Sequence, residues 1–381
     1  MKIYLIPLFS VMVGSITWSI SVLYALDLGA TIIQVNLIST IRSTMSILLL
    51  VPFGILSDRF GRKPMVLYSR ILIVLGMILR AMATEPNHLL IASFIGGFAG
   101  GGFFPILLSM VGDIAQPDEQ RESISTLYLF SSIGMLVGPI ISSFLLTQPY
   151  ITLRNLYQIV AVAQTGILIY LATQIRETRN ERPRERLVNY SGSITELIHQ
   201  TNFQKLLIMA FLYFFSRSII NTYIPIFGKI HLGLSNAEVA SFATYRNLGI
   251  MIIRLSSATL LTRVSIKPFI LFALAIGGIS SLASSMAYNY YFIVLILFLA
   301  GISYGATAIL GNTLVIQNST TENRGVANSL YNVAQSSGNI TNILTSPIAD
   351  TLGLIPVFLL GGIICFGSIG SILAYKANKT L

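Results

Sequence analysis

Long apolar stretches, separated by short polar or turn-rich breaks, recur along the whole chain. A stretch of about 20 apolar residues can cross the hydrocarbon core of a bilayer, about 30 Å thick, as an α-helix. The pattern therefore predicts an all-α membrane protein. Twelve spanning helices are expected, over residues 3–25, 32–57, 65–84, 88–111, 124–147, 153–175, 205–227, 236–262, 268–286, 290–314, 325–348 and 352–375.

One polar connection, residues 176–204, is much longer than the other breaks. Its first part, from Arg176 to Arg186, mixes positive and negative side chains too densely to enter a bilayer. We expect a solvated linker with room for a short surface helix. The linker divides the spans six and six, which predicts one six-helix bundle over residues 1–175 and a second over residues 205–381.

The composition agrees with a membrane protein and excludes a soluble one. Hydrophobic residues make up 54% of the chain and charged residues 10%, and the mean hydropathy is +0.76. Soluble domains carry about 25% charged residues. The net charge of +10 is spread over short loops, so the contiguous basic face that a nucleic acid needs is not expected.

The basic residues instead indicate an orientation in the membrane. If both termini are cytoplasmic, nearly all loop lysines and arginines fall on the cytoplasmic side, and only Arg154 and Lys229 lie in outer loops. This bias follows the positive-inside rule. It predicts a multi-pass protein of the cell membrane with both termini in the cytoplasm.

The two halves of the chain resemble each other. A shift of 204 residues aligns Leu28-Gly29 with Leu232-Gly233, Thr31 with Ser235, Arg42 with Arg246, Arg59 with Arg263, Lys63-Pro64 with Lys267-Pro268 and Gly134 with Gly338. Parallel halves of this kind move against each other about a site near the bilayer midplane. The repeat therefore predicts pseudo-symmetric bundles and alternating access.

A ten-residue motif follows the second span and contains Gly54, Asp58, Arg59, Gly61, Arg62 and Lys63. It resembles the loop signature of the major facilitator superfamily. Its glycines permit a tight turn, and its acid can accept hydrogen bonds from helix amides or from an arginine. We expect a gate latch here. The equivalent segment of the second half, residues 258–267, lacks the acid and the glycines, so the latch should be asymmetric.

Two further segments resemble motifs of the same family. Gly134, Gly138 and Pro139 in the fifth span are similar to a motif of its drug and proton antiporters, which favours export, although glycines in a membrane helix also serve close packing. The glycine-rich fourth span has Ser93 where the family has an arginine linked to proton transfer. The resemblance implies twelve helices in two bundles, a functional monomer, a small-molecule solute as partner and no cofactor.

The depth of the ionisable residues in the predicted spans indicates the charge of the solute and the route of proton coupling. Of the 14 acids, none is placed near the middle of a span, and the three histidines are peripheral. Asp27 and Asp113, at span ends, are the remaining candidates for proton coupling. Arg42, Arg217 and Arg246 lie deep in their spans, where an uncompensated charge costs at least ~2.5 kcal/mol.

These deep arginines should face a wet cavity or a polar partner. They can bind an anionic solute, or they can hold helix carbonyls and amides. Other arginines, Arg70, Arg80 and Arg254, lie nearer span ends and are expected to snorkel.

Two helices carry polar faces that extend this candidate site. Tyr213, Arg217 and Asn221 share one face of the seventh span, because they are four residues apart. The eleventh span carries a stripe that consists of Asn328, Tyr331, Asn332, Gln335, Asn339 and Asn342. Such amides line a cavity or bond to other helices. Trp18, the only tryptophan, lies on the first span and is a further candidate for the site.

The sequence thus predicts a secondary transporter that moves a small polar solute, with an anion favoured by the arginines and export favoured by the fifth-span motif. Alternatives are a proton-coupled multidrug exporter, an uptake permease for sugars or organic acids, and a solute sensor that does not transport. An enzyme and a metal site are not expected, since the single cysteine, Cys365, lies in an apolar stretch and no catalytic set can be assembled.

Overall fold

A computed structural model describes residues 2–100, 102–114, 120–178, 190–263, 265–320 and 323–375. Its secondary structure in those ranges is helical. The chain divides into two compact units, the first formed by Met1–Arg182 with Gly233–Thr244 and the second by Pro183–Leu232 with Tyr245–Leu381. Of the predicted linker, residues 179–189 lie outside the described residues.

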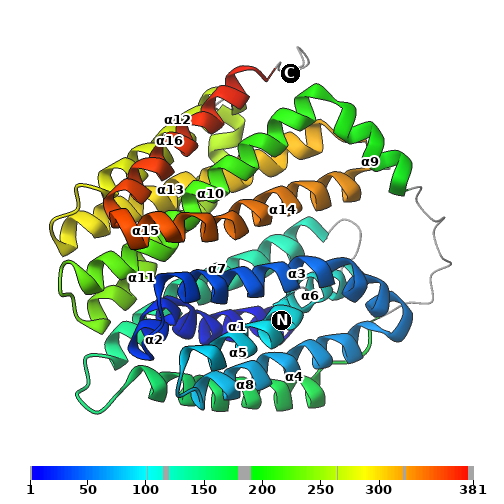
Figure 1. The fold of residues 1–381 in the computed structure, drawn as a ribbon. Helices are drawn as coiled ribbons and strands as arrows, with labels where there is room; N and C mark the ends of the chain where they lie inside the picture. The colour runs from blue at the N-terminus through cyan, green and yellow to red at the C-terminus, as the bar shows by residue number, and fades with distance from the viewer. Residues whose placement is uncertain are drawn as a thin grey trace. The chain divides into compact units, whose positions relative to one another are not determined.

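The first unit contains the helices of the first six predicted spans (Figure 1). They are α1 Lys2–Ser19, α2 Ser21–Asp27, α3 Ile32–Phe60, α4 Arg62–Ala81, α5 Pro86–Gly100, α6 Phe103–Ile114, α7 Gln120–Leu145 and α8 Leu153–Gln174. The predicted first span is bent by 40° between α1 and α2, and α5 and α6 together cover the predicted fourth span. Within this unit α1 packs along α7, and α4 packs on both α5 and α8.

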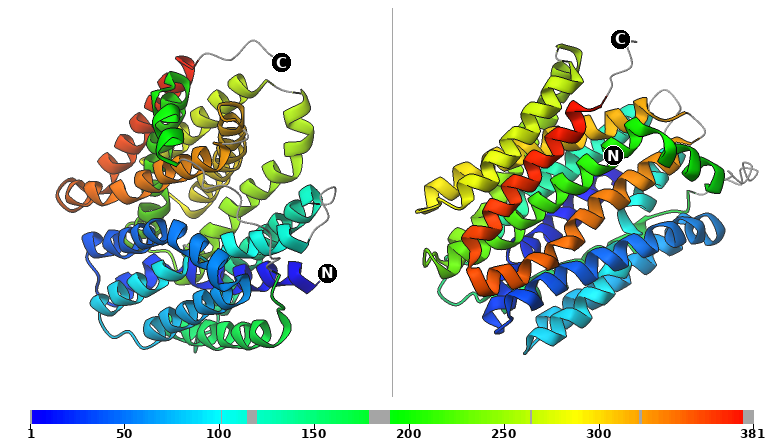
Figure 2. Two further views of the ribbon diagram at one scale, coloured as in Figure 1. Left: turned by 90° about the vertical axis from the view of Figure 1, so that its right-hand side faces the viewer. Right: turned by 45° about the horizontal axis from the view of Figure 1, so that its top comes forward.

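The second unit contains the remaining helices and one helix of the linker. They are α9 Tyr190–His199, α10 Thr201–Ile230, α11 Asn236–Arg263, α12 Ile266–Ser284, α13 Tyr290–Gln317, α14 Arg324–Thr341, η1 Asn342–Thr345, α15 Ser346–Leu352 and α16 Leu354–Leu373. Residues of α11 up to Thr244 belong to the first unit. The views in Figure 2 show α10 (green) beside α14 (orange) and α16 (red), in agreement with their contacts. The predicted short linker helix is present as α9.

Most of the predicted spans are long and apolar enough to cross a membrane. Among the described residues nine helical segments meet that criterion, and ten do if the bent pair α1–α2 is one span. The two predicted spans that do not are α11 and the segment α14–η1–α15. These two carry Arg246 and the amide stripe, so polar side chains lower their hydropathy.

The sequence repeat reappears as repeated local geometry in the two halves of the chain. Gly29 and Gly233 both have a positive φ, of 82° and 62°, at the turn that precedes the next span. Two residues later, Thr31 and Ser235 each accept a hydrogen bond from the backbone N–H three residues on. These paired turns and caps confirm that the 204-residue shift relates equivalent structural positions.

A second repeated feature is a close helix contact at two of the deep arginines, Arg42 and Arg246. A Cβ atom added to Gly97 of α5 would lie 2.8 Å from the backbone oxygen of Arg42 on α3. A Cβ atom added to Gly301 of α13 would meet the backbone oxygen of Arg246 on α11. Arg42 and Arg246 therefore each lie where a glycine lets the next helix approach the arginine's backbone.

One prediction about the arginines is wrong. Arg70 does not snorkel to the membrane surface, because its side chain is only 1% exposed. Its guanidinium donates to Ser10 of α1 and, at 2.8 Å, to the amide oxygen of Gln164 on α8, and lies 3.9 Å from the ring centroid of Phe103. Counting residues from the span end could not reveal these buried acceptors, which make snorkelling unnecessary.

Candidate functional site

The motif for which a gate latch is predicted runs from the end of α3 into the start of α4, and it is called the gate motif below. It comprises Gly54, Asp58, Arg59, Gly61, Arg62 and Lys63. Arg62 is its centre: Nη1 pairs with Asp58 Oδ1 at 2.6 Å and also donates to Ser57 Oγ at 2.9 Å, while Nε donates to Asp113 Oδ2 at 3.3 Å. Of the two partners expected for Asp58, helix amides or an arginine, the structure shows the arginine.

An acid of the linker caps the helix that follows the motif. Glu177 accepts from the backbone N–H of Arg62 at 2.9 Å through Oε1, and from the backbone N–H of Lys63 at 3.1 Å through Oε2. Gly61, at φ 104°, leaves the space that the carboxylate fills. A negative group at a helix N-terminus is stabilising, because it satisfies free N–H groups and faces the positive end of the helix dipole.

The two candidates for proton coupling lie in different surroundings. Asp113 contacts the gate motif, because its carboxylate accepts a hydrogen bond from Arg62. The same carboxylate lies 3.4 Å from Thr178 Oγ1. Asp27 is the last residue of α2 and is exposed. A coupling role for either residue stays a prediction.

The glycines of the fifth-span motif lie against the backbone of α1. A Cβ atom on Gly134 would lie 2.5 Å from the Leu8 oxygen, and one on Gly138 would meet the Met12 oxygen. Pro139 follows within the same helix, α7. In the second unit, Gly338 of α14 approaches the backbone of α10 in the same way. Close packing therefore accounts for these glycines, and a gating role stays a prediction.

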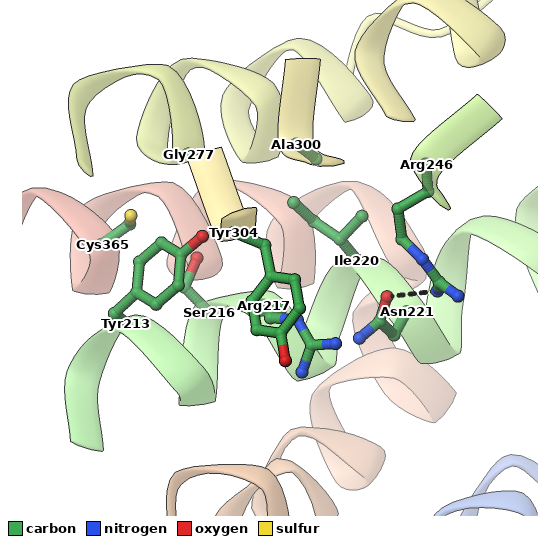
Figure 3. A pocket seen from close by; sticks show the side chains of 10 residues that line it. All are labelled: Tyr213, Ser216, Arg217, Ile220, Asn221, Arg246, Gly277, Ala300, Tyr304 and Cys365. Atoms are coloured by element: carbon green, nitrogen blue, oxygen red, sulfur yellow. Dashed lines mark hydrogen bonds between the residues drawn. The ribbon is translucent and has the colours of Figure 1, made fainter. Parts of the chain in front are cut away.

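The second unit contains a pocket that gathers the predicted polar face of the seventh span (Figure 3). About 330 Å³ of empty space lies within it, its opening to solvent included. It is lined by Tyr213, Ser216, Arg217, Ile220 and Asn221 of α10, Arg246 of α11, Gly277 of α12, Ala300 and Tyr304 of α13, and Cys365 of α16. Four of the predicted binding residues, Tyr213, Arg217, Asn221 and Arg246, therefore meet in one place.

Both arginines of this pocket are held by neutral groups. Arg246 Nη1 donates to Asn221 Oδ1 at 2.8 Å, and the guanidinium carbon of Arg217 lies 3.8 Å from the ring centroid of Tyr304. In Figure 3 the Asn221 amide is seen between the two guanidinium groups. The Nε atom of each arginine is buried and makes no hydrogen bond. The pocket therefore presents two positive charges with donor capacity left for a ligand.

The third deep arginine belongs to the first unit. The guanidinium carbon of Arg42 lies 5.3 Å from the ring centroid of Trp18, whose side chain is 53% exposed. Nearby on α4, Arg80 Nη2 donates at 2.9 Å to Ser93 Oγ, the serine that replaces the family's arginine. The sequence missed this contact, because the two residues come from different spans.

The stripe of the eleventh span does not line the pocket of the second unit. Tyr331 is buried with its hydroxyl against Gly311 of α13, and Asn342 is buried and donates to Thr222 Oγ1 of α10 at 3.2 Å. The other stripe members are half-buried or exposed, and they are Asn328, Asn332, Gln335 and Asn339. Interhelical bonding therefore explains one end of the stripe, and a role in binding stays a prediction for the rest.

Sequence reasoning also missed several residues of these sites. Tyr304 and Ser216 line the pocket, and Cys365 is buried and lines it too. Tyr304 lies among the small residues of α13. These residues indicate that α13 packs closely on another helix, but they do not indicate which side chain Tyr304 contacts. Glu177 carried no local signal, because the amides that it caps lie more than a hundred residues earlier.

These features define a class of protein. Repeated halves made of membrane-spanning helices, with a small pocket lined by polar and charged side chains, are the architecture of a secondary transporter. The Major Facilitator Superfamily model matches residues 3–341, and the chain belongs to this family of transporters, which are not enzymes.

Curated relatives are distant and carry the names of drug-resistance proteins. Multidrug resistance protein 2 of Bacillus subtilis (strain 168) is 21% identical over 327 residues, which cover 84% of this chain and 81% of the relative. Multidrug resistance protein MdtH of Yersinia enterocolitica is 30% identical over 152 residues, which cover 40% of this chain and 36% of the relative.

Solved structures show the same fold. The nucleoside transporter NupG matches with a TM-score of 0.84 and 12% identity, over 99% of this chain and 99% of that one. The human organic anion transporter MFSD10 matches with a TM-score of 0.67 and 14% identity, over 97% of each chain. The expected fold, an all-α membrane protein of two pseudo-symmetric bundles, is confirmed.

Proposed function

We propose that this transporter moves a small organic anion across the cell membrane by alternating access, with export as its favoured direction. The observation that carries the proposal is the pair Arg217 and Arg246 in one pocket, where only neutral side chains hold them. A guanidinium with free donors is the group that best recognises carboxylate or phosphate. Further candidates for contact with the solute are Arg42 and the half-buried or exposed stripe members, which are Asn328, Asn332, Gln335 and Asn339.

The proposal extends to the moving parts. The bundles over residues 1–175 and 205–381 act as the two bodies, joined by the linker 176–204, and the protein works as a monomer with both termini in the cytoplasm. The charge distribution of the loops supports this orientation. Asp58, Arg62 and Asp113 form the cytoplasmic latch, which opens and closes as the bundles move.

Thermal stability of the detergent-purified protein tests the solute class. A ligand at about a hundred times its dissociation constant stabilises the fold by about 2.7 kcal/mol. We expect dicarboxylates or phosphate esters to raise the melting temperature, and Arg217→Gln and Arg246→Gln to abolish that rise. Arg324→Gln, which removes a positive charge from the exposed start of α14, is the matched control.

A second candidate function is multidrug export. The names of the relatives and the fifth-span motif favour it. Stabilisation by lipophilic cations alone, unaffected by the two arginine substitutions, would replace the anion proposal with this one. Binding of anions without flux in liposomes under any gradient would indicate a sensor instead.

A further inference from the structure

The pocket of the second unit has two chemically different ends, which lie at opposite sides of the view in Figure 3. One end, called the charged end below, is formed by Arg217, Asn221 and Arg246. The other end has no acidic or basic side chain and is called the uncharged end; it is formed by Tyr213, Ser216, Gly277 and Cys365. A solute that fills the pocket therefore meets different chemistry at each end.

The hydrogen-bonding groups of the uncharged end are paired within the protein. Tyr213 Oη lies 2.9 Å from Ser303 Oγ, which itself donates to the backbone oxygen of Ala273 at 2.7 Å. The Tyr213 hydroxyl is therefore the donor of the first bond and has no proton left for a ligand. Cys365 Sγ donates to a backbone oxygen of α12 at 3.4 Å, and the Ser216 side chain is a hydrogen-bond partner of the same thiol.

The uncharged end is also narrow. A Cβ atom on Gly277 would lie 3.1 Å from Cε2 of the Tyr213 ring and 3.3 Å from Cys365 Sγ. The ring and the sulfur offer surface contact to a small apolar group. A hydroxyl group of a solute would lose its water there and gain no partner, which weakens binding.

The charged end has the opposite character, because the Nε atoms of Arg217 and Arg246 are buried and make no hydrogen bond. We propose that the pocket selects an amphipathic anion, with its acidic group at the charged end and a short aromatic or aliphatic group at the uncharged end. Anions that carry many hydroxyl groups, such as sugar phosphates, are then poor solutes. This inference rests on the proposed function and names the class of organic anion that it carries.

Isothermal titration calorimetry of the detergent-purified full-length protein tests the selectivity. The ligands are phenyl phosphate, glycerol 3-phosphate and inorganic phosphate, which share the acidic group and differ in what is attached to it. We expect phenyl phosphate to bind at least about tenfold more tightly than glycerol 3-phosphate, because the hydroxyl groups of glycerol find no partner at the uncharged end. Inorganic phosphate serves as the reference for the charged end alone.

A substitution at Gly277 tests the physical cause. Gly277→Ala places a methyl group between the Tyr213 ring and Cys365 and so fills the uncharged end. We expect the affinity for phenyl phosphate to fall to that for inorganic phosphate, whose own affinity stays the same. Gly278→Ala is the matched control: it is the next residue of α12, its methyl group would lie 3.0 Å from the Phe366 ring, and Gly278 does not line the pocket. This variant should keep the preference for phenyl phosphate.

The outcomes separate this inference from the proposed function. Equal affinities for the two esters, both lost in Arg217→Gln, would overturn the selectivity and leave anion transport standing. A Gly277→Ala protein that still prefers phenyl phosphate would also overturn it; if that variant fails to fold, the ranking in the unmodified protein decides. If none of the three phosphates binds, this inference fails, and the anion proposal fails with it when dicarboxylates do not raise the melting temperature either.

Discussion

The close approach of α5 to α3 gives a prediction that can be worked from the structure. Gly97→Ala adds one methyl group at the contact beside Arg42. Its carbon would lie 2.6 Å from Met45 Cβ, 2.8 Å from the Arg42 oxygen and 3.2 Å from the Arg42 Cα, whereas ordinary contact begins at 3.4 Å. Because these atoms belong to the backbone or are attached to it, no side-chain rotation relieves the clash, and the helices must move apart.

The expected loss in the free energy of unfolding follows from comparing Gly97→Ala with the same substitution at Gly96. Overpacking of a close contact costs roughly 1–3 kcal/mol, whereas alanine gains up to about 1 kcal/mol over glycine in a helix. Gly96→Ala separates the two effects, because a Cβ atom at Gly96 meets nothing within 4 Å. The difference between the two variants should therefore be roughly 1–3 kcal/mol, with Gly97→Ala the less stable.

Thermal unfolding of both variants in the same detergent measures this difference. In a domain of 150–250 residues, 1 kcal/mol shifts the melting temperature by about 2–4 °C. We expect Gly97→Ala to melt several degrees below Gly96→Ala and to bind anions less well, since the backbone of Arg42 is displaced. Equal melting temperatures would refute the close contact between α3 and α5.

Three more substitutions test other contacts. Asp58→Asn removes the ion pair with Arg62 and should slow transport with little change in melting temperature, because the carboxylate is mostly exposed; unchanged flux would exclude a latch role. Glu177→Gln should weaken the cap of α4 by about 1 kcal/mol, seen as faster amide hydrogen exchange in its first turn. Arg70→Met strips two buried acceptors of their donor and should lower the melting temperature, whereas an unchanged value would contradict its bonds to Ser10 and Gln164.

The features that the sequence predicted correctly depend on residues that are close together along the chain. The turn glycines Gly29 and Gly233, each followed by a capping residue, need only a few neighbouring residues to form. The apolar stretches likewise reflect local composition, and their order along the chain matches the helices. The face shared by Tyr213, Arg217 and Asn221 follows from helical periodicity alone, and all three line the pocket.

The features that the sequence did not predict depend on packing between distant segments. Arg70 was expected to snorkel, because depth was counted along its own helix, whereas its acceptors come from α1 and α8. Tyr304 carries no signal for its contact with Arg217, since a tyrosine in a membrane helix suits many environments. The cap on α4 joins the backbone of Arg62 and Lys63 to Glu177 of the linker, and no local pattern connects residues so far apart in the chain.

Two helical segments are too polar to meet the hydropathy criterion for a membrane span. Their polar side chains make insertion into the membrane less favourable. Arg246 lies on α11, and the amide stripe lies on α14 and the first residue of η1. Polar groups in a membrane segment are costly, so they persist where the folded protein supplies partners or where function needs them. Asn342 has such partners in α10, whereas the guanidinium of Arg246 has a single amide partner and an unbonded Nε. By this reasoning Asn342 is structural, and the proposed anion would offset the cost of placing Arg246 in the membrane.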